Sequence, residues 1–483
     1  MNYTELIVFI VYFVFMLGIG LYFFLKSKSA SDRDYFLGGR NMGAWVSALS
    51  AGASDMSAWV LMGLPASIYA AGMGQTWIAI GLGLGYALSW IFEAPRLRRF
   101  SIAANDSITI PQYLTNRFLS KSKALQVLCA GIFLVAYTVY AASSIKACGT
   151  LFNTVMGIDA NVAMYGAAVI IVLYTFLGGF SAVCWTDFFQ GLLMLAALLV
   201  APIFALALIN NGGGAANATL PDGYFNFMTS WQDIVSGLGW GLGYFGMPHI
   251  IIRFMSLKSE KELKKSSVIG ISWTTIILIM SVVAGVAGRL FLGELADSST
   301  VFITMVRKIF PALISGLLLS AILSAAMSTA DSQLLASASA FASDVYKPLI
   351  RKKASDKEML WASRLVVAAI AVVAVFIAAN PNSGTIMGLV ENAWGVFGAA
   401  FGPVIMLSLF WKRFTFGGAV VGIATGAIVD IGWLVLLKST GVYEIIPGFF
   451  AGLIAAVVVS LLSKAPSQEV QDLFDKASKP EEA

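Results

Sequence analysis

The sequence predicts an all-α membrane protein with about thirteen membrane-spanning helices. Of its 483 residues, 58% are hydrophobic and only 12% are charged, whereas soluble domains carry about a quarter charged residues. Apolar residues also form long runs, such as 191–209 and 365–379, that approach the roughly 20 residues needed to cross a hydrocarbon core. A chain of this composition has too little polar surface for water, so we expect a lipid bilayer to surround it.

Thirteen apolar segments are predicted to span the membrane as one domain, residues 1–465. The first is predicted to be a retained helix and not a signal peptide, because no positive charge precedes it and its apolar core is too long. A short charged tail, residues 466–483, is expected to be cytoplasmic and disordered. The thirteen segments lie near 4–25, 42–70, 74–95, 123–155, 160–178, 184–210, 230–256, 267–292, 310–345, 360–380, 385–411, 415–437 and 443–463.

Positive charge gathers in alternate loops, so that most of the 31 Lys and Arg residues fall on one side of this arrangement. The positive-inside rule makes that side the cytoplasm. The prediction is therefore a multi-pass protein of a bacterial inner membrane with a periplasmic N-terminus and a cytoplasmic C-terminus. The net charge of +5 follows from this placement and does not indicate nucleic-acid binding. The basic segments are 26–41, 96–123, 253–265, 347–364, 412–413 and the tail.

Enzymatic, metal and redox chemistry find little support in the sequence. The three cysteines, Cys129, Cys148 and Cys184, lie in apolar surroundings without metal-ligand spacing, and we expect them to be buried as small hydrophobic residues. A single histidine, His249, excludes histidine clusters. No pair of intramembrane carboxylates is apparent either, so neither an enzyme nor an organic cofactor is expected. A sensor would need a signalling domain that the short tail does not supply.

The segment 42–70 is the first candidate site. Its middle is small and polar, which disfavours continuous helix, and small residues such as Gly52 and Ser54 also suit ordinary helix contacts in membranes. Helix packing does not account for Asp55, a carboxylate near mid-span without a Lys or Arg nearby in the segment. Such residues are costly in a membrane and are usually functional. A hard cation surrounded by oxygen ligands would satisfy Asp55.

The segment 310–345 is the second candidate. Ala325, Ser328 and Thr329 are spaced i, i+3 and i+4, so they share one helix face. Their oxygens could coordinate sodium, although such hydroxyls commonly bond to carbonyls of the preceding turn. Taken alone, this pattern favours the second explanation.

The segment 230–256 is the third candidate. Five glycines between 237 and 246, followed by Pro248, predict an interrupted helix. No strand–helix unit surrounds its G-x-G-x-x-G pattern, so a nucleotide loop is not expected. Trp240 and Tyr244 lie four residues apart near mid-span. Aromatic side chains with polar tips suit a small amphipathic ligand, the alternative being an interfacial aromatic belt.

The two interrupted segments occupy corresponding places in the chain. Each opens a set of five spans, about 42–210 and about 230–411, as in transporters built from inverted repeats. Such transporters place their substrate and ion sites where the discontinuous helices meet. This correspondence favours a transporter over a channel, which would not need two interrupted helices.

Several long segments resemble the solute:sodium symporter family and, within it, the sodium/proline symporters. The resemblance covers nearly the whole chain and implies a LeuT-like fold with additional helices at both ends. It also implies import of L-proline with co-transported Na⁺ by alternating access, without an obligatory protein partner. The segments that carry it are DYFLGGRNMGAWVSALSAGASDMSAWVLMGLP (34–65), WTDFFQ (185–190), GWGLGYFGMPHIIIRFM (239–255), LLSAILSAAMSTADSQLL (318–335) and YEIIPGFF (443–450).

The resemblance also assigns roles to individual residues. It places sodium on the carbonyl oxygens of Ala53, Met56 and Ala325 and the hydroxyls of Ser328 and Thr329. It implies that Asp55 and Ser57 are essential to binding, that Asp187 assists sodium passage toward the cytoplasm, and that Arg40 contributes to coupling. The implied substrate contacts are Trp59, Tyr140, Trp240, Tyr244 and Pro248.

Three polar residues depart from the pattern of the proline branch. Glu391 and Asn392 are unusually polar for the eleventh span, and Lys146 is unusual in the fourth. We expect Glu391 to face a water-filled vestibule, in preference to forming a second ion site, and Lys146 to extend toward the outside. Because such residues could change substrate choice, another amino acid, a sugar or pantothenate remains the alternative solute.

Overall fold

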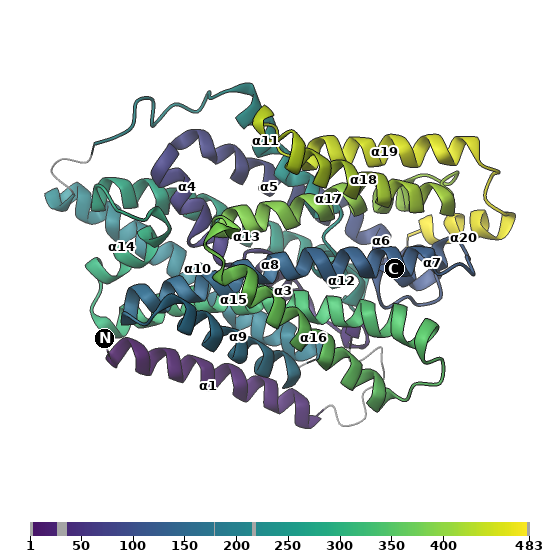
Figure 1. Ribbon diagram of the computed structural model, residues 1–483, viewed down its shortest axis with the longest axis horizontal. Helices are drawn as coiled ribbons and strands as arrows, with labels where there is room; N and C mark the ends of the chain where they lie inside the picture. The colour runs from purple at the N-terminus through teal and green to yellow at the C-terminus, as the bar shows by residue number, and fades with distance from the viewer. Residues whose placement is uncertain (1–2, 27–35, 178, 215–218, 481–483) are drawn as a thin grey trace.

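The computed structural model describes residues 3–26, 36–177, 179–214 and 219–480, and these are helical apart from loops and one isolated β-bridge. The long helices run side by side along the longest axis of the molecule (Figure 1). Within the described ranges, ten helices are long and apolar enough to cross a membrane. Lys28 and Arg33 of the predicted cytoplasmic loop lie outside the described residues.

Every predicted span contains helix. The three that do not count among the ten are the two interrupted segments and the shorter segment 160–177. The main helices are α1 (Tyr3–Lys26), α3 (Ala44–Asp55), α4 (Gly63–Ala71), α5 (Thr76–Leu88), α6 (Ala94–Ala103), α7 (Ile110–Arg117), α8 (Ala124–Met156), α9 (Ala160–Leu177), α10 (Phe180–Leu208), α11 (Trp231–Gly239), α12 (Pro248–Ser256), α13 (Glu260–Leu292), α14 (Val301–Ile309), α15 (Ala312–Ser339), α16 (Asp356–Ala379), α17 (Ile386–Phe410), α18 (Phe416–Leu436), α19 (Ile445–Leu462) and α20 (Gln468–Ser478).

The first interrupted segment breaks directly after Asp55. Met56 and Ser57 have non-helical backbone angles, and the Ser57 hydroxyl accepts a hydrogen bond from the Trp59 backbone N–H before α4 begins. Small polar residues compete with the helix for backbone hydrogen bonds, which explains why the helix ends here. The predicted interruption is confirmed.

The second interrupted segment breaks at Gly246 and Met247, between a 3₁₀ helix (Trp240–Phe245) and α12. Its glycines also permit close packing, which the sequence did not indicate. A Cβ atom added to Gly85 of α5 would lie 2.2 Å from the Gly241 carbonyl oxygen. Only glycine therefore allows the backbones of α5 and the second interrupted segment to come this close.

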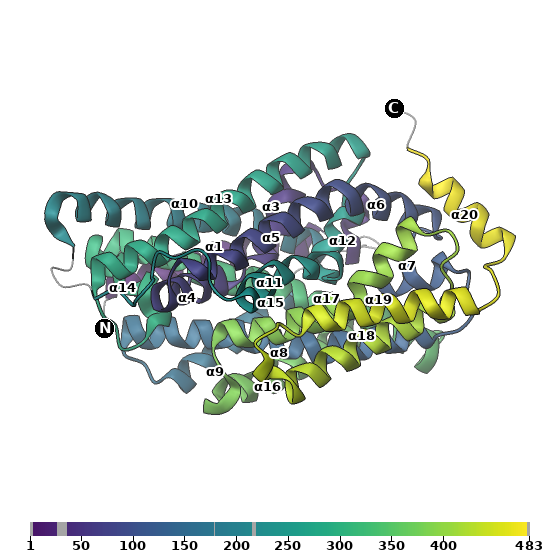
Figure 2. The same ribbon diagram turned by 90° about the horizontal axis from the view of Figure 1, so that it is seen from above.

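The interrupted helices lie inside the bundle. α3 packs against α10, α12, α13 and α15, and α3 and α15 lie near the middle of both views (Figures 1 and 2). α10 and α13 cover one side, and α18 and α19 cover the opposite side (Figure 2). The break after Asp55 is thus surrounded by protein, as irregular backbone at membrane depth requires.

The expectation of a disordered tail is wrong for residues 468–478, which form α20. Val470, Phe474 and Ala477 are buried and recur at helical spacing, so they form one apolar stripe. The Phe474 ring meets Phe100 of α6 edge to face at 5.3 Å, and Asp475 forms an ion pair with Lys412 at 2.5 Å. The overall composition of the tail indicated only that it is charged. Its short apolar stripe lets it form a helix that packs against the bundle.

Phe474→Ala should release α20 from α6, because burying a phenylalanine side chain contributes about 1.5–3 kcal/mol. Amide exchange over residues 468–478 should then accelerate by about tenfold or more, measured by hydrogen–deuterium exchange in detergent. Leu473→Ala, on a less buried side of α20, is the matched control. Unchanged exchange in Phe474→Ala would contradict this packing role.

Candidate functional site

The break in α3 meets α15 at the predicted oxygen-rich point. The Ser328 hydroxyl donates to the Ala53 carbonyl oxygen at 2.7 Å and lies 3.3 Å from that of Ala325. The Thr329 hydroxyl is buried without a hydrogen-bond partner. The fold therefore brings together oxygens from segments 275 residues apart, which no local pattern in the sequence could show.

Met56 and Asp55 complete the break. Met56 is fully buried, and its backbone N–H bonds to the Gly52 carbonyl at 2.8 Å. The Tyr244 hydroxyl donates to Asp55 Oδ2 at 2.6 Å, while Oδ1 has no donor. The two interrupted segments are therefore joined through Asp55, and one carboxylate oxygen remains available to a ligand.

The predicted substrate residues form an aromatic layer beside Asp55. The Trp59 and Trp240 rings lie 6.5 Å apart, and Tyr140 and Tyr244 are fully buried. Pro248, the first residue of α12, is also buried. A residue that the sequence analysis missed supports this layer, because Trp394 Nε1 donates to the Trp240 carbonyl at 2.8 Å.

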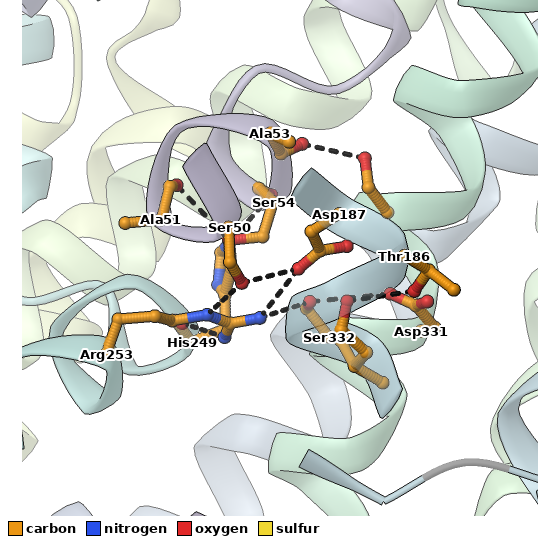
Figure 3. A network of polar contacts seen from close by, with 12 residues as sticks. Ser50, Ala51, Ala53, Ser54, Thr186, Asp187, His249, Arg253, Asp331 and Ser332 are labelled. Carbon is orange, nitrogen blue, oxygen red and sulfur yellow. Dashed lines mark hydrogen bonds and ion pairs between the residues drawn. The ribbon is translucent and has the colours of Figure 1, made fainter. Parts of the chain in front are cut away.

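A buried ion pair lies deeper along α3 (Figure 3). Arg253 Nη2 lies 3.2 Å from Asp187 Oδ2, and the side chains are only 2% and 0% exposed. The Ser50 hydroxyl donates to the same carboxylate oxygen at 2.7 Å and accepts from Arg253 Nε at 3.1 Å. The placement of Arg253 in a cytoplasmic loop is therefore wrong, because the long side chain turns inward to pair with Asp187.

A second carboxylate shares this cluster. Asp331 interacts electrostatically with both Asp187 and Arg253, and Arg253 also donates to the Ser332 hydroxyl at 2.6 Å. The expectation that no two intramembrane carboxylates would meet is thus wrong. Asp331 stood within a segment already singled out, but only the fold sets it beside Asp187. Asp187 and Asp331 thus share one guanidinium partner.

Arg40 lies apart from this centre. Its guanidinium pairs with Asp106 at 2.8 Å and donates to the carbonyls of Met255 and Ser107 and to the hydroxyl of Ser101. It therefore joins the segment before α3 to α6 and to the end of α12. Arg40 thus lies near the start of α3 and the end of α12, and not at the breaks after Asp55 and at Gly246.

The three departures from the family pattern lie in two environments, with Asn392 beside Glu391 in the lining of one cavity. The Lys146 ammonium donates to the Ser383 hydroxyl at 3.2 Å and to the Gly384 carbonyl, so it extends to the loop between α16 and α17. Glu391 lines a cavity of about 230 Å³. Trp240 lines the same cavity, so the aromatic layer borders it.

Two discontinuous helices around buried oxygens and aromatic side chains define a secondary transporter. The chain belongs to the sodium:solute symporter family, whose model matches residues 35–426. It therefore functions in membrane transport with sodium as the coupling ion and is not an enzyme.

Curated relatives match almost their entire length. The chain is 44% identical to the high-affinity proline transporter PutP of Bacillus subtilis, covering 95% of this chain and 98% of the relative. It is also 44% identical to the osmoregulated proline transporter OpuE of that organism, over 96% of both chains. A sodium/proline symporter of Staphylococcus aureus is 42% identical over 98% of this chain and 96% of its own.

Solved structures support the LeuT-like fold. A sodium-coupled sialic acid symporter in a substrate-bound, outward-open state has a TM-score of 0.79 at 21% identity, covering 97% of this chain and 99% of the other. The nucleobase-cation-symport-1 transporter Mhp1 has a TM-score of 0.57 at 14% identity, covering 91% and 97%. The TM-scores establish a shared fold at low sequence identity. The polar residues of each chain decide its ligand.

Removing one partner of the Arg253–Asp187 pair should destabilise the protein, because the other charge is left buried and unpaired. We expect Arg253→Met and Asp187→Asn each to cost about 3–5 kcal/mol, and the double variant to cost less than their sum. Thermal unfolding in detergent measures both effects. Additive losses would show that the two side chains do not stabilise each other.

Proposed function

We propose that the chain imports L-proline together with sodium by alternating access across a bacterial inner membrane. The observation that carries this proposal is the near-complete match, at 42–44% identity, to relatives named as proline transporters. The aromatic layer is chemically suitable, because an imino acid has an apolar ring and a charged group that needs polar partners.

We propose that the sodium ion binds where α3 and α15 meet. Its ligands would be the carbonyl oxygens of Ala53, Met56 and Ala325 with the hydroxyls of Ser328 and Thr329. Hard cations prefer oxygen ligands, and the 2.7 Å contact between Ser328 and Ala53 supports this choice.

The proposed substrate site lies on the other side of the break. Trp59, Tyr140, Trp240, Tyr244 and Pro248 would enclose the proline ring, with Asp55 and Ser57 between substrate and sodium. The Tyr244–Asp55 hydrogen bond supports direct communication, because it connects an aromatic substrate contact to the residue next to a sodium ligand. Closure of the transporter around this site would then be most favourable when both proline and sodium are bound.

Asp187 and Arg40 are proposed to act after binding. Asp187 of α10 accepts a hydrogen bond from Ser50 of α3, three residues before the proposed sodium ligand Ala53, and its ion pair with Arg253 would reorganise when a cation approaches. Arg40 holds the ends of both interrupted segments in one network, so it is suited to coordinate their movement.

The proposed topology follows the charge distribution. Two inverted repeats, about 42–210 and 230–411, would form the transport core. The N-terminus would be periplasmic, and the tail with α20 would be cytoplasmic, in agreement with the positive-inside rule.

Purified protein in liposomes should take up labelled L-proline when an inward sodium gradient is applied. A proton gradient alone should not support uptake. Sodium-driven uptake of a different amino acid, a sugar or pantothenate, with no proline uptake, would retain the transporter and reject proline.

Thr329→Ala and Asp55→Asn should abolish the stimulation of uptake by sodium, because each removes an oxygen ligand or the charge beside the proposed ion. Uptake at graded sodium concentrations, normalised to protein in the liposomes, measures the effect. Ser339→Ala, a buried hydroxyl elsewhere on α15 without a hydrogen-bond partner, is the control. Wild-type sodium dependence in Thr329→Ala would place the ion elsewhere.

Tyr244→Ala should weaken proline affinity more than sodium affinity, since it removes a ring from the aromatic layer. Tyr244→Phe keeps the ring and loses only the hydrogen bond to Asp55, so its proline affinity should fall less. Competition binding with labelled proline measures the proline affinity of each variant. Equal loss of proline and sodium affinity in Tyr244→Ala would remove Tyr244 from the substrate site.

A further inference from the structure

A second group of carboxylates lies outside the proposed core site, where α17 begins, α18 nears its end and α19 starts. Its members are Glu391 of α17, Asp430 of α18 and Glu444 at the start of α19. They are 39 and 14 residues apart in the chain, so only the packing of the three helices brings them close. Neither the sodium site nor the aromatic layer uses them.

Asp430 is the buried end of this group. Its side chain is fully buried, and neither carboxylate oxygen has a hydrogen-bond donor. A Cβ atom added to Gly395 of α17 would lie 2.9 Å from Asp430 Oδ1 and 3.4 Å from Glu444 Cγ. The two acidic side chains therefore converge over Gly395, where the missing Cβ leaves room for them.

Glu444 connects Asp430 to the open cavity. It is only 6% exposed, its Oε1 atom has no donor, and it lines the cavity together with Glu391. The start of α19 favours one negative charge at Glu444, but this leaves Asp430 unexplained. None of the ion pairs found among the described residues includes Asp430, Glu444 or Glu391.

The cavity gives solvent access to Glu391 and Glu444, and Glu444 in turn lies beside Asp430. Lys438 lies on its wall as the single basic side chain, against the acidic side chains of Asp233, Glu391 and Glu444. Trp240 also lines the cavity, and its ring lies 6.5 Å from that of Trp59 in the aromatic layer. A cation entering the cavity therefore meets excess negative charge before it reaches the aromatic layer.

Burying the Asp430 carboxylate without a hydrogen-bond donor is strongly unfavourable, so a bound positive charge is the physical explanation for its proximity to Glu444. We propose that Asp430 and Glu444 form a second, outer site for a monovalent cation, and that sodium occupies it. Among the described residues, no three His, Cys, Asp or Glu side chains are grouped as a metal site. A monovalent ion needs fewer charged ligands than a divalent metal, and cavity water can complete its oxygen shell.

This site would hold sodium at the cavity before the core site opens to it. Focusing of cations by an acidic cavity with low-dielectric walls raises their local concentration and their rate of association. The inference rests on sodium coupling, which family membership establishes, and it is independent of proline as the substrate.

Equilibrium binding of radioactive sodium to the purified full chain, without any amino acid, tests the proposal. At saturating sodium, Asp430→Asn and Glu444→Gln should each bind one ion fewer per chain than the wild-type protein. Both substitutions keep side-chain size while removing charge. Glu444→Gln lies at the edge of the cavity, so it remains informative if Asp430→Asn does not fold.

Two further variants separate this site from its surroundings. Asp233→Asn should bind as many ions as the wild type, because Asp233 Oδ2 already accepts from Ser230 at 2.6 Å. Thr329→Ala should lose a different ion, so the double variant Thr329→Ala/Glu444→Gln should lose two. Wild-type sodium binding in both Asp430→Asn and Glu444→Gln would overturn the outer site.

Discussion

The ion pair between Arg253 and Asp187 is the interaction on which the centre of the structure depends. It joins α12 to α10, and through Ser50 and Ser332 it extends to α3 and α15. Leaving either of these buried charges without its partner is costly, so the pair favours an arrangement in which these four helices stay in contact. The break in α3 and the hydroxyls of α15 are held in contact by the same four helices.

A transporter needs polar groups at membrane depth, and polar groups there are costly unless they are paired. Some buried polar groups in the structure are fully paired, whereas others keep an atom without a hydrogen-bond partner. Asp55 keeps one oxygen without a donor, and Thr329 keeps a hydroxyl without a partner. These incompletely satisfied groups lie next to fully bonded ones, which supplies ligand oxygens without a general loss of order.

The cavity beside Trp240 lies between the proposed core site and the group of carboxylates formed by Glu391, Asp430 and Glu444. On one side, the aromatic rings of Trp59, Trp240 and Trp394 pack around the core. On the other side, Glu391 and Glu444 face the cavity, with Asp430 buried behind them. Glu391, which stood out in the sequence together with its neighbour Asn392, thus belongs to a group whose other members lie on neighbouring helices.

The sequence by itself determined the membrane class, all thirteen helical segments and both helix interruptions, because these follow from local composition and periodicity. It also indicated the residues around both breaks, through the resemblance of long segments. Only the tertiary structure decided that Arg253 turns inward, that Asp331 joins Asp187, that Asp430 meets Glu444 and that the tail folds against α6. Each of these depends on side chains from distant segments, whose proximity is fixed by helix packing and leaves no trace in local sequence.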